Sequence, residues 1–134
     1  MTTSNPAATR AIPGLRIRPY AGEQDLPDLV RIENAENEAD GIRSRVTLDE
    51  QRAYFASPSD SFDPARDVVI AEIDGRAVGY GTGEWVDARD SEVREYRLFG
   101  GVDPAWRRRG IGTALFADNQ RRARALAETH RTER

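Results

Sequence analysis

The segment 67–86 constrains the fold of this chain more than any other part of the sequence. Its first half, DVVIAEI, is rich in β-branched residues, Asp74-Gly75 is typical of a two-residue hairpin turn, and RAVGYGTGEWV follows as a second strand. A third strand is expected from about Val93 to Val102, because Pro104 cannot continue it. These strands predict an antiparallel meander at the centre of the fold.

A strand and a helix are expected before this meander. The short run 15–18 alternates apolar and basic residues and stops at Pro19. Asp25 can cap a helix that begins near Leu26 and ends in the polar run 33–41.

Two further helices are indicated by their first residues and apolar positions. Thr47 and Glu50 form a capping-box pattern, and the helix that follows should bury the aromatic residues Tyr54 and Phe55. Another helix is expected over 111–127, after the third strand. The order of elements predicts a mixed α/β fold with a largely antiparallel central sheet flanked by helices.

Composition excludes several classes of protein and site. The 134 residues suit one domain, placed at residues 14–134 after a disordered leader at residues 1–13, and no apolar run approaches the roughly 20 residues of a membrane span. With no cysteine and a single histidine, His130, we expect no metal site, no disulfide and no serine–histidine triad. The leader lacks the apolar core of a secretory signal, which predicts a cytoplasmic protein. The basic residues are all arginine, a bias that we attribute to a GC-rich bacterial genome.

Charge is distributed unevenly along the chain. Residues 1–103 carry 12 arginines against 20 acidic residues, a net charge of −8, whereas residues 104–134 carry 8 arginines against 3 acidic residues, a net charge of +5. The carboxyl-terminal part should therefore attract anions. Because an acidic body repels a polyanion, a small phosphorylated ligand is favoured over nucleic acid, although binding of RNA or DNA by the arginine-rich end is a third, weaker hypothesis.

The most informative motif is the string VDPAWRRRGIGTAL, from Val102 to Leu115. Gly110 and Gly112 lie between a strand and a helix, where they allow a tight turn and expose consecutive backbone N–H groups at a helix N-terminus. Such a loop forms a cradle for phosphate. The guanidinium groups of the arginine run 107–109 match phosphate geometry and predict a pyrophosphate or a 3′-phosphate as the ligand.

Other glycine-rich phosphate loops do not fit this string. The chain has no Gly-Lys-Ser/Thr sequence for a P-loop, and Leu115 stands where a dinucleotide fingerprint would have its third glycine. Two glycines alone more often mark the entry to a helix without any ligand. The full string in its strand–loop–helix setting favours a ligand site.

This string resembles the Arg/Gln-x-x-Gly-x-Gly/Ala motif of the GNAT superfamily of acetyl-CoA-dependent N-acetyltransferases. The resemblance covers about residues 14–128 and implies a GNAT-like fold. It also implies that acetyl-CoA is the co-substrate, that its pyrophosphate is held by the loop and helix start, and that its pantetheine arm pairs with the strand before the loop. The cofactor-binding residues implied are Val102, Arg107, Arg108, Arg109, Gly110, Ile111, Gly112 and Thr113. A bulge is expected at Gly100-Gly101.

The resemblance further implies what the chain does and what it lacks. The expected reaction is direct acetyl transfer from acetyl-CoA to a primary amine on a small molecule or peptide, without metal, nucleic acid or membrane. Family members continue with further strands and a helix, so the chain is expected to be incomplete at its carboxyl end. Either that missing region or a second copy of the chain would then complete it. The alternative function is a catalytically degenerate half-domain that binds CoA or a partner as a scaffold.

Candidates for the acid–base chemistry are weak. Some family members place a glutamate eleven residues before the first motif arginine, which corresponds to Tyr96, with Glu95 beside it. A solvent-facing Glu95 is the simpler interpretation, and Tyr96 is expected to be a wall or core aromatic. The acidic residues Glu36, Glu38 and Asp40 could attract a cationic amine, but a solvated charge run is the commoner explanation. The alternating glycines of the second strand could admit a substrate or a backbone, or could only relieve crowding in a twisted hairpin, which we favour.

Overall fold

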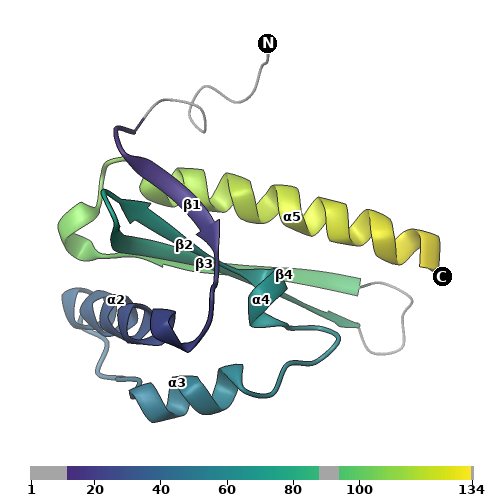
Figure 1. Cartoon of the computed structure of the whole chain (residues 1–134), viewed down its shortest axis with the longest axis horizontal. Helices are drawn as coiled ribbons and strands as arrows, with labels where there is room; N and C mark the ends of the chain where they lie inside the picture. Colours follow the sequence, from purple (N-terminus) through teal and green to yellow (C-terminus); the bar gives the residue numbers. More distant parts are fainter. Residues whose placement is uncertain (1–11, 88–93, 134) are drawn as a thin grey trace.

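The computed structural model describes residues 12–87 and 94–133 (Figure 1). In chain order the elements are β1 (Leu15–Pro19), the 3-10 helix η1 (Glu23–Asp25), α2 (Leu26–Ala39), α3 (Leu48–Phe55), α4 (Pro64–Asp67), β2 (Val68–Ile73), β3 (Arg76–Asp87), β4 (Arg94–Val102), the 3-10 helix η2 (Pro104–Trp106) and α5 (Ile111–Glu133). Figure 1 shows α5 across one face of the sheet, with α2 and α3 on the other face. Most of the predicted leader lies outside the described residues.

The four strands form one sheet in the order β1-β2-β3-β4, and every neighbouring pair is antiparallel. This confirms the predicted meander and the mixed α/β class. At the β2–β3 turn, Asp74 and Gly75 have φ angles of 51° and 83°, the left-handed backbone that a tight hairpin turn requires. The bulge expected at Gly100-Gly101 is wrong for the β3–β4 pairing, whose register runs without a shift; the irregularity lies instead between Ala71 and Glu72 of β2.

Two hydrophobic cores lie on opposite faces of the sheet. Side chains alternate along β2, so that Val68 and Ile70 join the cluster beneath α2, whereas Val69 and Ile73 join the cluster beneath α5. Because helices cover both faces, β2 is apolar on both sides and does not alternate between apolar and polar residues.

Glycines on β3 allow α5 and β4 to approach closely. A Cβ atom at Gly79 would lie 2.9 Å from the Gly101 carbonyl oxygen and 3.0 Å from the Leu115 side chain. A Cβ at Gly81 would lie 2.9 Å from Oδ1 of Asn119 on α5. The glycines therefore admit a neighbouring backbone and helix, and our preference for crowding within the hairpin alone is wrong.

One predicted helix cap and one predicted helix end differ from the structure. Asp25 does not cap α2, because its carboxylate accepts hydrogen bonds from the Arg18 guanidinium at 2.8 and 3.0 Å and from the Ala21 N–H at 2.8 Å. Helix α5 does not end near Ala127 but continues to Glu133. Its arginine- and alanine-rich second half has high helix propensity, which favours the extra turns.

The short helix α3 begins as predicted. The Glu50 N–H donates to Thr47 Oγ1 at 3.1 Å, and the Thr47 N–H donates to Glu50 Oε1 at 2.8 Å, which confirms the capping box. Tyr54, however, is 53% exposed, so its predicted burial is wrong. Its ring stacks on Phe62, which supplies the buried aromatic side chain in this region.

Candidate functional site

A cavity of about 490 Å³ lies between β4 and the first turns of α5. Three parts of the chain meet there: the end of β4, the loop before α5, and the exposed side of the first two turns of α5, with Glu36 added from α2. The lining residues are Glu36, Leu98, Phe99, Gly100, Gly101, Val102, Trp106, Arg107, Arg108, Gly110, Ile111, Gly112, Thr113, Leu115, Phe116 and Asn119. All the predicted cofactor-binding residues except Arg109 are therefore brought to one cavity.

The start of α5 presents unpaired backbone donors to this cavity. The first backbone bond of the helix runs from the Ala114 N–H to the Gly110 carbonyl at 3.0 Å, so the amides of residues 111–113 precede the helical ladder. Gly110 has a φ of +87°, a conformation that turns the chain into the helix. A Cβ at Gly112 would meet only Val102 Cγ2 at 3.7 Å, an ordinary contact. Packing does not require glycine at this position, and its absent side chain leaves the cavity open.

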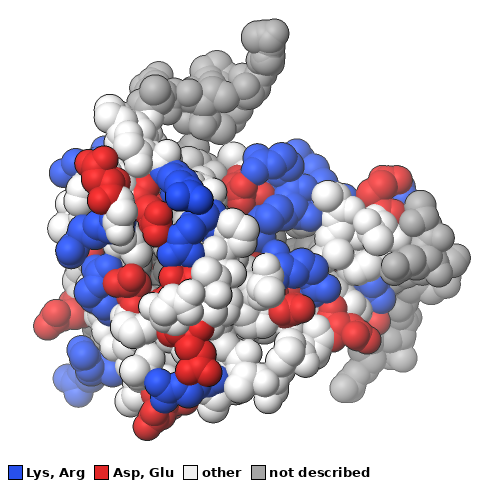
Figure 2. Space-filling model, in the orientation of Figure 1, with Lys and Arg blue, Asp and Glu red and all other residues white. Residues whose placement is uncertain are grey.

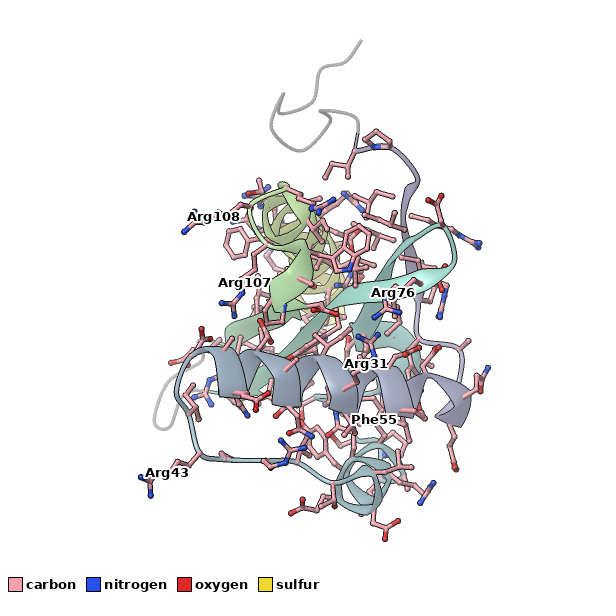
Figure 3. All side chains as sticks on the ribbon, turned by 90° about the vertical axis from the view of Figure 1, so that its left-hand side faces the viewer. Arg31, Arg43, Phe55, Arg76, Arg107 and Arg108 are labelled. Carbon is pink, nitrogen blue, oxygen red and sulfur yellow. The ribbon has the colours of Figure 1, made fainter. Side chains whose placement is uncertain are left out.

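The three consecutive arginines point in different directions. Arg107 makes two hydrogen bonds to the Asp40 carboxylate, at 3.1 and 3.2 Å, and is turned toward α2. Arg109 lies over the Trp106 ring, with its guanidinium carbon 4.7 Å from the ring centroid. Arg108 has a left-handed backbone, with a φ of +66°, and Figure 3 shows its side chain extending away from the body of the molecule.

Figure 2 shows arginines and acidic residues interspersed over the face that it displays, with no broad patch of a single sign. In the described part of the chain, no helix is both long and apolar enough to cross a bilayer. Within the same residues, no group of three or more histidine or acidic side chains is arranged to hold a metal ion.

Glu95 and Tyr96 lie outside this cavity. The Glu95 side chain is 55% exposed and contacts the Arg97 guanidinium at 3.4 Å. Tyr96 shares a hydrogen bond of 2.6 Å with His130 Nδ1, and the two rings stack with centroids 5.7 Å apart. The structure therefore brings Tyr96 to α5 and leaves Glu95 at the surface.

Glu36 lines this cavity, so the prediction of a solvated charge run is wrong for this residue. Its side chain is only 21% exposed, and Oε2 accepts a hydrogen bond from the Val102 N–H at 2.9 Å. A Cβ at Gly101 would overlap Glu36 Oε1, so a side chain there would displace this carboxylate from its observed position. The signal was present in the spacing, because Glu36 follows Leu29 by seven residues and Ile32 by four and so continues the buried stripe of α2.

Burial raises the pKa of the Glu36 carboxyl, while the Val102 N–H and Arg107 act in the opposite direction. Burial also raises the pKa of Glu33, one turn earlier on α2. Burial, together with these two carboxylates, raises the pKa of the Tyr80 hydroxyl on β3. The sheet face beneath α2 is therefore a partly desolvated environment in which negative charge accumulates.

A second cavity, of about 370 Å³, lies on the α2 side of the sheet. Its walls come from α2, α3, the segment before α4, and the strands β2, β3 and β4. The lining residues are Leu29, Glu33, Glu36, Asn37, Gln51, Tyr54, Phe55, Phe62, Val68, Tyr80, Thr82, Glu84 and Phe99. Glu36 and Phe99 line both cavities, so the two spaces meet at these side chains.

Several solved structures share this fold. A GCN5-related N-acetyltransferase from Sphaerobacter thermophilus superimposes with a TM-score of 0.66 and 22% identity, over 85% of this chain and 33% of that one. An aminoglycoside acetyltransferase from an uncultured soil metagenome, solved with sisomicin, superimposes with a TM-score of 0.59 and 24% identity, over 84% of this chain and 72% of that one. The yncA protein of Salmonella typhimurium, solved with its cofactor acetyl-CoA, superimposes with a TM-score of 0.60 and 21% identity, over 85% of this chain and 65% of that one. The chain thus spans one third of the first of these proteins and about two thirds of the other two.

Sequence comparison identifies the family. No curated protein sequence matches significantly. The family model described as the acetyltransferase (GNAT) domain matches residues 64–134, which include β2, β3, β4 and α5 with both glycines of the loop. This match covers more than half of the chain and agrees with the fold of the structural neighbours, so the chain belongs to the GNAT acetyltransferase family.

Proposed function

We propose that this protein binds acetyl-CoA in the cavity between β4 and α5 and transfers the acetyl group directly to a primary amine. One observation carries the proposal: residues 111–113, whose amides precede the helical hydrogen bonds, line a cavity together with Gly110 and Gly112, and this cavity continues along β4. The GNAT family match and the neighbour solved with acetyl-CoA support the same ligand.

The residues of the cavity would bind the two ends of this ligand differently. The helix start offers backbone donors and the positive end of the α5 dipole, which favour a pyrophosphate. Further along, the cavity is lined by backbone and apolar side chains of β4, among them Leu98 and Phe99, which suit an uncharged pantetheine arm. When bound, acetyl-CoA supplies an activated acetyl thioester, and the protein has to orient the amine and accept its proton.

Some of the arginines beside the cavity also suit an anionic ligand. Arg108 extends from the loop, and Arg109 follows it on Trp106. Arg107 is already bound to Asp40, so we expect it to shape the loop more than it binds phosphate. A guanidinium that keeps an existing carboxylate partner gains less from a second anion.

Calorimetric titration with acetyl-CoA, followed by detection of thiol release in the presence of primary amines, tests this proposal. The chain contains no cysteine, so a thiol-reactive dye reports only the CoA that is released. We expect binding and amine-dependent release. Binding without release for any amine would favour the scaffold alternative, and no binding at millimolar acetyl-CoA would contradict the proposal.

A further inference from the structure

The cavity on the α2 side has walls of a distinct chemistry. Three carboxylates line it, from Glu33, Glu36 and Glu84, and no arginine from the described residues does, although the chain contains 20 arginines. The carboxylates would repel an anionic ligand, whereas they attract a cation. The lining therefore selects for positive charge.

Aromatic rings complete the walls. Tyr54, Phe55, Tyr80 and Phe99 line the same cavity, and Figure 3 shows Phe55 between α2 and α3. Aromatic faces attract ammonium groups and also pack against apolar bodies. A ligand with one ammonium on an aromatic or apolar body matches both features.

Glu36 stands where this cavity meets the one between β4 and α5. The Val102 N–H donates a hydrogen bond to Oε2 of Glu36, and Oε1 occupies space that a side chain at Gly101 would fill. A carboxylate at this boundary can contact a group in either cavity. Glu38, two residues later, is exposed and lines neither.

We infer that the α2-side cavity binds the acceptor as a primary ammonium on an aromatic or apolar body, and that Glu36 holds this ammonium and takes its proton. The inference rests on the acetyl-CoA function proposed above. In the reaction, a proton passes from the ammonium to the Glu36 carboxylate, and the freed nitrogen lone pair forms the bond to the acetyl carbon. The carbon–sulfur bond breaks, and its electron pair leaves on the CoA sulfur.

The charges around Glu36 suit a base. Glu33 on α2, Asp40 just after α2 and Tyr80 on β3 interact electrostatically with it, and Arg107 from the loop lies 3.9 Å from Oε2. Arg107 is bound to Asp40 by two shorter contacts, so it neutralises Glu36 only in part. Burial raises the pKa of Glu36, which makes the carboxylate a stronger base than an exposed one.

The first experiment tests the class of acceptor with two probes, phenylethylamine and β-alanine, by thiol release from acetyl-CoA. Phenylethylamine carries an ammonium on an aromatic body, and β-alanine adds a carboxylate that the acidic walls should repel. We expect kcat/KM for phenylethylamine to exceed that for β-alanine at least tenfold. Equal values, or turnover of neither probe by a protein that binds acetyl-CoA, would overturn the acceptor assignment.

The second experiment compares Glu36→Gln with Glu38→Gln, the same change of charge on an exposed part of the same helix. The glutamine at position 36 keeps an oxygen that can accept the Val102 N–H. At about pH 7 we expect Glu36→Gln to lower kcat/KM about a hundredfold or more, with acetyl-CoA affinity within about threefold of wild type. Glu38→Gln should stay within about twofold of wild type.

A pH series separates a base from a structural residue. Near pH 10 roughly half of a primary amine is already neutral, so the deficit of Glu36→Gln should shrink about tenfold. If Glu36→Gln does not fold, Gly101→Ala places a Cβ 2.0 Å from Oε1 and displaces the carboxylate without deleting it. The same deficit, with the same recovery at high pH, is then expected.

The outcomes are separable. Wild-type turnover in Glu36→Gln, or a deficit equal at both pH values, would overturn the role of Glu36 alone. If Gly101→Ala is the variant used, turnover at the wild-type rate has the same meaning. Failure of the wild-type protein to bind acetyl-CoA would overturn the proposed function and this inference together.

Discussion

Gly110 and Gly75 share a left-handed backbone, with φ angles of +87° and +83°, but only Gly110 lines the cavity at the start of α5. Valine at either position is strained by roughly 1–2 kcal/mol, because L-residues disfavour this region. We expect Gly110→Val and Gly75→Val to lose similar stability and only Gly110→Val to abolish CoA binding. Denaturant unfolding and calorimetry measure the two effects separately. Equal CoA affinity in the two folded variants would show that residue 110 is not part of a phosphate cradle.

Arg108 and Arg107 differ in what already holds their guanidinium groups. Arg107 is paired with Asp40, whereas Arg108 extends from the loop. We expect Arg108→Ala to weaken CoA binding by about 1–3 kcal/mol, with a loss that shrinks as salt is added. Arg107→Ala should cost less than about 1 kcal/mol of binding energy. Titrations at low and high salt check this order, and a larger loss for Arg107→Ala would contradict it.

Among the elements, the packing of β1 against the start of α2 is stabilised by one carboxylate. Asp25 is buried and bonded to Arg18, which also reaches Glu72 of β2 at 2.8 Å. The hydrogen bond from Arg18 lowers the pKa of Asp25, so the pair stabilises the fold above the unfolded pKa of about 4 and is lost as pH falls through the lower folded pKa. The contribution of the Arg18–Asp25 pair to stability should therefore decrease in acid.

We expect Asp25→Asn to reduce the free energy of unfolding by about 1–3 kcal/mol near pH 6. The difference from wild type should be smaller near pH 2, because the stabilising Asp25 charge is lost as pH falls through its lowered folded pKa. Urea unfolding at the two pH values measures this difference. The same loss at both would show that the Asp25 charge does not stabilise the packing of β1 against α2.

Elements with a short-range signal could be predicted from the sequence. The turn at Asp74-Gly75 and the capping box at Thr47 depend on neighbouring residues, and both appear in the structure. Asp25 is also a residue type that caps helices, but Arg18 from another element binds its carboxylate. Local patterns therefore predict a cap only where no distant partner competes for it.

The same limit applies to the site. The loop at Gly110 is contiguous in sequence and could be predicted, whereas the contact between Glu36 and Val102 joins residues 66 positions apart. That contact requires α2 and β4 to meet at one edge of the sheet, which follows from the strand order and not from either segment. A polar run at the end of a helix gives no indication of the strand it will face.

At the scale of the whole molecule, ligand binding should stabilise a domain whose cavity joins β4, α5 and α2. Acetyl-CoA at about 100 times its Kd adds about 2.7 kcal/mol to the stability of the folded state. We expect the Tm to rise by roughly 5–10 °C. Thermal unfolding with and without acetyl-CoA measures the shift, and Gly110→Val serves as the control without a shift. A Tm that does not move at millimolar acetyl-CoA would contradict binding to the folded chain.

In the proposed complex, the start of α5 holds the CoA pyrophosphate through its backbone amides. Amide chemical shifts of the isotope-labelled protein during titration with CoA test it most directly, because each amide reports its own contact. We predict that the largest shifts fall on residues 110–113, while the amides of α3, on the other face of the sheet from α5, stay unchanged. Saturating shifts confined to other residues, with the amides of residues 110–113 unmoved, would show that the start of α5 does not hold the pyrophosphate.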